Sequence, residues 1–296
     1  MSKIMQRDYL PGDKWIYYKI YTGHSTSDLI LTETILPICQ SLLKQHIIDK
    51  WFFVRYSDPE HHLRVRLHLK DTSNFAVVVQ RFKDIFKKYI IANIIWNIQL
   101  DTYKQEIERY GGKKKVELSE DLFFHDSLMI SKFVSLIEGE EGEEIRWLFS
   151  LRAIDTFLDS FHFTITEKLN LMDQLKTGFG NEFGISRPLK KQLDEKFRIN
   201  RKRIENFLNP TFFTNPDYIE IQEILDTKRE NSIETIKKTI SSCKKSKTNI
   251  NTFVASHIHM TMNRIFKSKG RIHELVIYDF LYRYYLSTYH KKAKVT

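Results

Sequence analysis

Over the first ~110 residues, strand-type and helix-type patterns follow one another in the order strand, helix, strand, strand, helix, strand. Aromatic and β-branched residues mark the strands at 14–21, 51–56, 61–70 and 96–103. Apolar residues at helical spacing mark the helices at 27–48 and 71–90. A β-α-β-β-α-β order is typical of ferredoxin-like units, so we expect an antiparallel or mixed sheet with flanking helices.

From about residue 119 onward the helical period dominates, which predicts an α+β fold with a mostly helical second half. We expect one domain over 1–296, with an α/β portion at 1–115 and a mainly helical portion at 116–296. Thr164 and Glu167 predict a capping box at the start of one helix. The stretch GFGNEFG (178–184) lacks the spacing of a dinucleotide-binding motif and is predicted to be a loop.

The composition excludes several classes of protein. A net charge of +10 and a pI near 9.3 favour an acidic partner, but lysines scattered along the chain are typical of a solvated surface. Two cysteines make no disulfide framework, and the longest apolar run is too short to span a bilayer. No motif indicates a metal, a cofactor or direct nucleic-acid binding, and no signal peptide is visible, so we expect a cytoplasmic protein.

Three stretches could carry chemistry. In HHLRVRLHLK (61–70), alternation puts Arg64 and Arg66 on one strand face, where they either meet water or clamp an anion. YKQEIERYGG (103–112) brings Glu106 close to Arg109, either as a charged turn or as part of a site. SHIHMTMNRIF (256–266) carries His259, either a core histidine or a proton-transfer group.

Five motifs in register carry a family resemblance: WIYYKIYTG, FFVRYSDPEHHLRVRL, EIERYGG, FFHDS and SHIHMTMNRIF. In this order the chain resembles the lantibiotic dehydratase C-terminal domain, also known from thiopeptide-type bacteriocin biosynthesis. The resemblance covers roughly residues 12–290. It implies a lyase that eliminates glutamate from glutamylated Ser or Thr of a ribosomally made precursor peptide, leaving dehydroalanine or dehydrobutyrine.

The resemblance also implies roles and partners. Arg66, Arg109 and His259 are expected to be catalytic, with Arg64 and Glu106 binding the substrate, and no metal or cofactor. The expected partners are the glutamylated precursor and a separate tRNA-dependent glutamylating subunit, as in a split dehydratase, and a homodimer is left open. Two alternatives stay open: a pyridine-forming cycloaddition enzyme of the same fold, and a non-catalytic peptide- or RNA-binding subunit.

Overall fold

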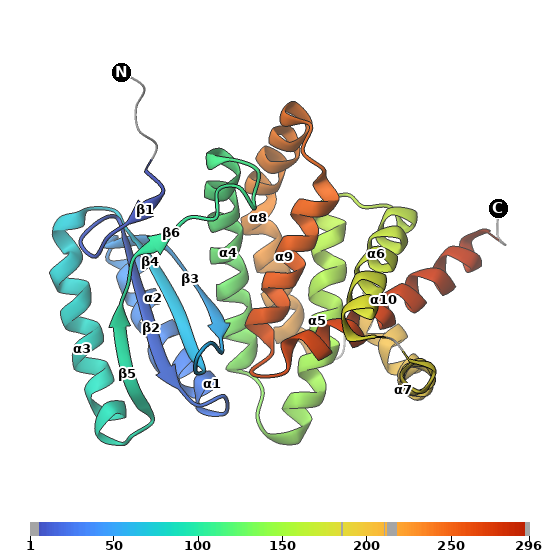
Figure 1. Ribbon diagram of the computed structural model, residues 1–296, viewed down its shortest axis with the longest axis horizontal. Coiled ribbons are helices and arrows are strands. Elements are labelled where there is room, and N and C mark those ends of the chain that lie inside the picture. Colours follow the sequence, from blue (N-terminus) through green and yellow to red (C-terminus); the bar gives the residue numbers. More distant parts are fainter. Residues whose placement is uncertain (1–5, 185, 210, 212–217, 294–296) are drawn as a thin grey trace. The chain divides into compact units, whose positions relative to one another are not determined.

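The computed structural model describes residues 6–184, 186–209, 211 and 218–293. The chain divides into two compact units, residues 1–135 and 136–296. The predicted α+β class is confirmed, because all the strands described lie in the first unit and the second is helical (Figure 1).

Unit 1 contains two antiparallel sheets. The larger has the strand order β3-β4-β2-β5, and the smaller pairs β1 with β6. The strands are β1 (Asp8–Tyr9), β2 (Trp15–Thr22), β3 (Ile48–Tyr56), β4 (His62–Leu69), β5 (Ile95–Leu100) and β6 (Tyr103–Lys104). The helical elements are α1 (Thr26–Ile30), the π-helical turn η1 (Leu31–Ile35), α2 (Leu36–Lys44), the 3-10 turn η2 (Thr72–Asn74), α3 (Phe75–Ile91) and α4 (Lys113–Val134).

Two predicted elements are divided in the structure. The predicted helix 27–48 is interrupted by the wide turn η1, which continues directly into α2, so Pro37 lies inside a longer helical run, where proline disfavours regular α-helical hydrogen bonding. The predicted strand 96–103 is split into β5 and β6, which belong to different sheets.

One face of the larger sheet is the core of unit 1. Leu63, Val65 and Leu67 of β4 are fully buried on this face. Tyr18 of β2 points to the same face and stacks on Phe82 of α3, with 4.8 Å between ring centroids. Alternation along β4 therefore leaves its arginines on the opposite face.

Helix α4 runs along β3, the edge strand of the larger sheet. The Oγ atom of Ser127 accepts a 3.2 Å hydrogen bond from the backbone N–H of Phe53. The ring of Phe123 packs on Phe52, with 5.5 Å between centroids. The helix thus covers an edge that would otherwise present unpaired backbone groups.

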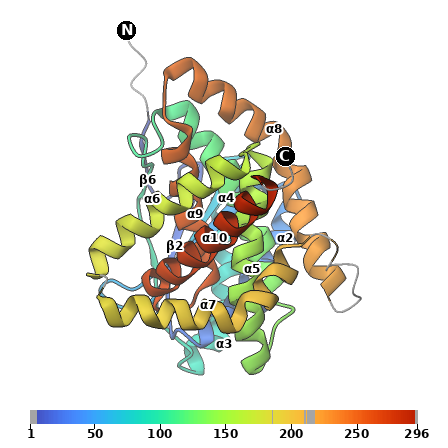
Figure 2. The same cartoon turned by 90° about the vertical axis from the view of Figure 1, so that its right-hand side faces the viewer.

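Unit 2 is built from helices. They are α5 (Gly139–Ser160), α6 (Ile165–Phe183), α7 (Arg187–Leu208), α8 (Ile219–Ser246), α9 (Ile250–Ile265) and α10 (Gly270–Ala293). Helices α6 and α7 both pack against α10 (Figure 2). The predicted capping box is confirmed, since Thr164 and Glu167 bond reciprocally at the start of α6.

The loop prediction for 178–184 was wrong. Residues 178–183 form the last turns of α6, and only Gly184 adopts the left-handed conformation that ends the helix, with φ of 61°. Packing of α6 on α10 outweighs the low helix propensity of Gly178 and Gly180.

Candidate functional site

Strand β4 places Arg64 and Arg66 side by side on the face opposite the core. Backbone pairing sets Arg66 between Tyr17 of β2 and Phe52 of β3, and it sets Arg64 between Lys19 and Val54. Both arginines are half-buried. The sequence-based pairing of these two residues on one face is therefore confirmed.

Aromatic rings surround the guanidinium group of Arg66. Its carbon Cζ lies 4.5 Å from the ring centroid of Tyr17, 5.0 Å from that of Tyr103 and 5.3 Å from that of Phe52. The Nε atom is buried and has no hydrogen-bond partner among the described residues. No described carboxylate pairs with Arg66 or Arg64, so neither charge is neutralised within the part of the chain that the structure describes.

Arg64 is oriented by its neighbours on the same face. Its Nε donates a 3.0 Å hydrogen bond to Nε2 of His62, and its Cζ lies 3.4 Å from the ring centroid of Tyr56. Burial lowers the pKa of His62, and the adjacent Arg64 charge lowers it further. His62 therefore remains a neutral acceptor that holds Arg64 in place.

The other basic residues of this stretch have other surroundings. His68 bonds Asp49 at 2.8 Å and packs on Trp15, and Lys70 is exposed. At Tyr17, burial raises the phenol pKa, whereas Arg66, Arg64 and Lys19 each act to lower it. Asp101, which pairs with Lys19, acts in the opposite direction, so the two arginines are the cations near Tyr17 that no described carboxylate pairs.

Glu106 and Arg109 lie at the turn that leads from β6 into α4. Arg109 Nη1 and Glu106 Oε2 form a 2.8 Å ion pair, and both side chains are exposed. Gly111 and Gly112, with φ of 77° and 120°, reverse the chain after this pair in a conformation that other residues rarely adopt. The sequence-based expectation that Glu106 and Arg109 lie close together is confirmed.

Tyr103 connects this turn to the arginine face. Burial, above all, raises the pKa of its phenol well above the ordinary range, with Glu120 and Glu106 raising it further and Arg66 lowering it. The Tyr103 hydroxyl donates a 2.7 Å hydrogen bond to Oε1 of Glu120 on α4. Glu106 and Arg66 therefore both act electrostatically on one buried ring.

Sequence reasoning missed Glu120. Its carboxylate is 2% exposed and also accepts a 2.6 Å hydrogen bond from Gln105. Burial raises its pKa, although Gln105, Tyr103 and two lysines oppose that shift. No local pattern in the helix Lys113–Val134 distinguishes this glutamate from an exposed one.

In unit 2, His259 lies on α9 and is half-buried, with 35% of its side chain exposed. Its Nδ1 atom lies 2.7 Å from Oε1 of Glu274 on α10, a carboxylate that is 2% exposed. His257, two residues earlier, is buried against the rings of Phe253 and Phe157. The two histidines therefore have different surroundings, as expected of residues two apart on a helix.

A further set of contacts surrounds Glu274. Arg271 Nη1 lies 3.2 Å from Oε2 of Glu274, and Arg271 also pairs with Glu182 of α6. The Arg271 guanidinium stacks over Phe179 at 4.1 Å. Phe179 and Glu182 belong to the stretch GFGNEFG. This segment therefore contacts Arg271 from the last turns of helix α6.

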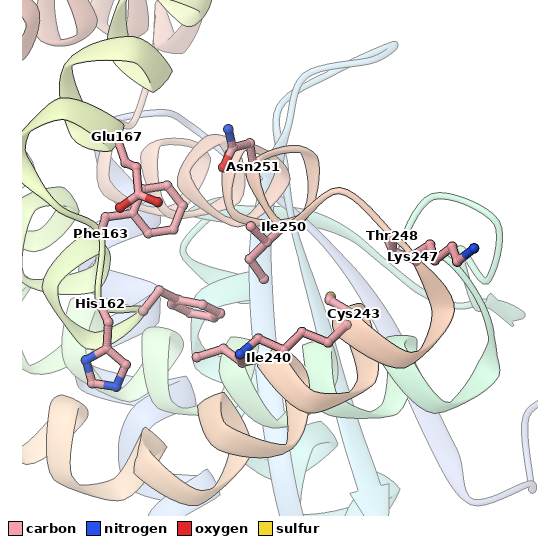
Figure 3. Close-up of a pocket in the computed structure, with 11 residues that line it drawn as sticks. His162, Phe163, Glu167, Ile240, Cys243, Lys247, Thr248, Ile250 and Asn251 are labelled. Atoms are coloured by element: carbon pink, nitrogen blue, oxygen red, sulfur yellow. The ribbon is translucent and has the colours of Figure 1, made fainter.

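A pocket of about 440 Å³ lies in unit 2 between the start of α6, the end of α8 and the start of α9 (Figure 3). Its lining includes Phe163, Ile240, Ile250, Glu167 and Lys247. None of the site residues predicted from the sequence lines it.

The described residues contain no group of three or more side chains that could hold a metal ion. Nor is any described helix long and apolar enough to cross a membrane.

Comparison with known proteins identifies the family. The fold is of the α+β class, and two arginines lie side by side on one face of its larger sheet. The family model described as the lantibiotic biosynthesis dehydratase C-terminal domain matches residues 15–285, and the chain belongs to this family.

The curated relatives are much longer proteins. The nisin biosynthesis protein NisB of Lactococcus lactis subsp. lactis is 28% identical over 177 residues, which cover 58% of this chain and 17% of NisB. The epidermin biosynthesis protein EpiB of Staphylococcus epidermidis is 22% identical over 253 residues, covering 85% of this chain and 24% of EpiB. The chain thus spans about a quarter or less of the length of these relatives.

Solved structures share the fold. The tRNA-dependent lantibiotic dehydratase MibB from Microbispora sp. 107891 superposes with a TM-score of 0.76 at 18% identity, covering 98% of this chain and 29% of MibB. The pyridine synthase TbtD from thiomuracin biosynthesis gives 0.62 at 12% identity, covering 93% of this chain and 98% of TbtD. At these identities the likeness concerns the fold.

Proposed function

We propose that this protein is a lyase that eliminates glutamate from glutamylated Ser or Thr residues of a ribosomally made precursor peptide. A base removes the Cα proton of the modified residue, the Cβ–O bond breaks, and the electron pair leaves with glutamate as a carboxylate. The product is dehydroalanine from Ser or dehydrobutyrine from Thr. The reaction needs a proton-transfer group, stabilisation of negative charge and a binding site for the glutamyl group.

The environment of Arg66 is the observation that carries this proposal. A half-buried guanidinium with a buried, unbonded Nε and no described carboxylate partner is suited to bind an anion. Arg64 adds a second charge-assisted donor on the same strand face. Two neighbouring arginines that contact aromatic rings and lack a described carboxylate partner favour binding of a carboxylate-bearing substrate. They are less typical of a surface that only meets water.

The remaining roles follow from the chemistry of each group. Arg66 and Arg109 bind the glutamyl carboxylate and stabilise developing charge, and Arg64 supports them. Glu106 accepts the glutamyl ammonium or orients Arg109, to which it bonds at 2.8 Å. His259 transfers the proton, because its half-exposed imidazole has a ring nitrogen, Nε2, that no described residue bonds.

The proposal treats residues 1–296 as one functional domain, because the family match at 15–285 extends over both units. Its partners are a precursor peptide and a tRNA-dependent glutamylating component that acts first. That component supplies the glutamyl ester, a step for which this proposal assigns no residue here.

The alternative is a pyridine-forming cycloaddition enzyme of the same fold, and the fold likeness to TbtD is what supports it. The arginine face favours elimination instead, because a cycloaddition between dehydroamino acids offers no glutamate to bind. The two reactions also differ in substrate, so one assay separates them.

The test uses a synthetic precursor peptide that carries a glutamyl ester on one Ser, so that no glutamylating component is needed. Incubation with the protein should release free glutamate and leave dehydroalanine, both measured by mass spectrometry. A His259→Gln variant should retain the ester. An intact ester with the unmodified protein rejects elimination, and ring formation from a bis-dehydro peptide would support the alternative.

A further inference from the structure

The contact between His259 and Glu274 joins two helices of unit 2 that follow each other in the chain. The imidazole Nδ1 lies 2.7 Å from a carboxylate oxygen that is almost fully buried, at the end of a side chain 2% exposed. A buried carboxylate needs a donor on each oxygen to offset its desolvation. Here His259 faces Oε1 and Arg271 faces Oε2.

This arrangement fixes which nitrogen of His259 carries the proton. An ionised carboxylate only accepts hydrogen bonds, so the nitrogen that faces it must be the donor. The Arg271 guanidinium, which can only donate, lies 3.2 Å from Oε2, so the Glu274 carboxylate accepts on that side as well. In the neutral imidazole, Nδ1 therefore holds the hydrogen and Nε2 carries the lone pair.

The Nε2 atom forms no hydrogen bond with any residue that the structure describes, and 35% of the His259 side chain is exposed. The imidazole thus presents its basic nitrogen away from Glu274. This is the atom that can take a proton from a substrate.

Glu274 is itself fixed through Arg271. The Arg271 guanidinium stacks over Phe179 at 4.1 Å and pairs with Glu182, both on α6. Three helices therefore determine the position of one carboxylate: α6 through Arg271, α9 through His259, and α10, which carries Glu274. A side chain with so many contacts has few alternative rotamers, so the imidazole it bonds is held in one orientation.

We propose that Glu274 is the positioning residue of His259, which selects the Nδ1–H tautomer and leaves Nε2 as the atom that exchanges the proton. This inference rests on the proposed function, in which His259 transfers the proton. Glu274 acts through His259 and does not touch the substrate. A purely structural ion pair between α9 and α10 would affect stability without affecting the rate of elimination.

The first measurement is independent of activity. In protein labelled with ¹⁵N-histidine, the resonances of His259 are assigned by their loss in His259→Gln, and two-bond couplings report its tautomer. The unmodified protein should show Nδ1–H. Glu274→Gln should shift the population toward Nε2–H, because an amide can donate to Nδ1, and Glu274→Asp should retain Nδ1–H.

The second measurement is the elimination rate on the synthetic glutamyl peptide. Glu274→Gln should lower kcat about 10- to 100-fold with KM changed less than about threefold, and Glu274→Asp should recover part of the loss. Asp279→Asn is the matched control, since Asp279 is also a buried carboxylate on α10, paired with Arg283 rather than with a histidine. It should leave both the tautomer and kcat unchanged.

Nδ1–H in folded Glu274→Gln together with an unchanged kcat would overturn the inference. The same holds if Asp279→Asn lowers kcat as much as Glu274→Gln does. If the unmodified protein eliminates no glutamate, the proposed function fails, and the tautomer of His259 alone then decides whether Glu274 orders the imidazole.

Discussion

The guanidinium carbon of Arg66 lies 4.5 Å from the ring centroid of Tyr17, the residue that faces it across the sheet on β2. Strand pairing and a cation–π contact thus fix the same side chain, and its buried Nε lacks a partner among the described residues. The planar donor fork of arginine, rather than charge alone, is what such a setting presents to a carboxylate.

Arg66→Lys should therefore lower kcat/KM for glutamate elimination by about 100-fold, since a bidentate charge-assisted interaction of about 3 kcal/mol is lost while the positive charge remains. The rate is measured on the synthetic glutamyl peptide. Arg81→Lys is the control, because Arg81 lies on α3, which covers the opposite face of the sheet, and bonds only Gln45 in the structure described. Equal rates for Arg66→Lys and the unmodified protein would argue against an arginine-specific carboxylate contact.

The ion pair between Glu106 and Arg109 is exposed, so it contributes little to stability, about 0–1 kcal/mol. Arg109→Ala should abolish measurable elimination and change the free energy of unfolding by no more than about 1 kcal/mol. The nearby exposed pair of Arg7 and Glu108 provides the matched control. Arg7→Ala should have the same small effect on stability and none on elimination, and parallel losses of activity in both variants would contradict the role of Arg109.

The raised pKa of Glu120 should make the free energy of unfolding depend on pH. Burial raises its pKa in the folded protein, so the native state binds the proton more tightly than the unfolded chain does. Its contribution is most favourable below the unfolded pKa and falls as pH rises through the folded pKa. Glu120→Gln removes this dependence, so its stability relative to the unmodified protein should increase from pH 4 to pH 7, as measured by urea unfolding.

Glu167 is the control with the opposite sign. The backbone N–H of Thr164, above all, lowers the pKa of Glu167 in the capping box. Its contribution is present above the unfolded pKa and is lost as pH falls. Glu167→Gln should therefore cost most near pH 7 and least near pH 4, and the same pH trend for both variants would contradict the assignment for Glu120.

Asp155 lies in a buried charge cluster in unit 2. Its Oδ1 is 2.6 Å from Lys168 Nζ and accepts a 2.8 Å hydrogen bond from Tyr285, and Arg152 lies 3.5 Å from Oδ2. Asp155→Ala should lower the free energy of unfolding by about 3–5 kcal/mol, because it removes a buried carboxylate that two buried cations and a buried hydroxyl bond. Asp159 bonds the same lysine at 2.7 Å but is 58% exposed, so Asp159→Ala should cost about 1 kcal/mol or less. Similar losses in urea unfolding for the two variants would refute this difference.

Short-range sequence patterns predicted those contacts of the site that form within one strand or one turn. Alternation along β4 predicted that Arg64 and Arg66 share a face, and spacing within one turn predicted that Glu106 meets Arg109. The capping residues of α6 also follow from short-range chemistry. These relations need only the geometry of a single strand, turn or helix end.

The sequence could not reveal the contacts made by tertiary packing. Glu274 meets His259 because α10 packs on α9, and Glu120 is buried because β6 and its extension lie against α4. The helical state of Gly178 and Gly180 likewise depends on α10, whose packing overrides local propensity. No periodicity within one segment encodes which segment will cover it.

Strand β4 has a consequence for anyone who recombines such proteins. Its odd-numbered residues Leu63, Val65 and Leu67 build the core, and its even-numbered Arg64 and Arg66 face away from it. A junction that adds or removes one residue inside 62–69 would exchange the two sets, burying both cations and exposing the apolar residues. Chimaeras should instead be joined in the exposed turn at 57–60, where a change in length leaves this strand in register.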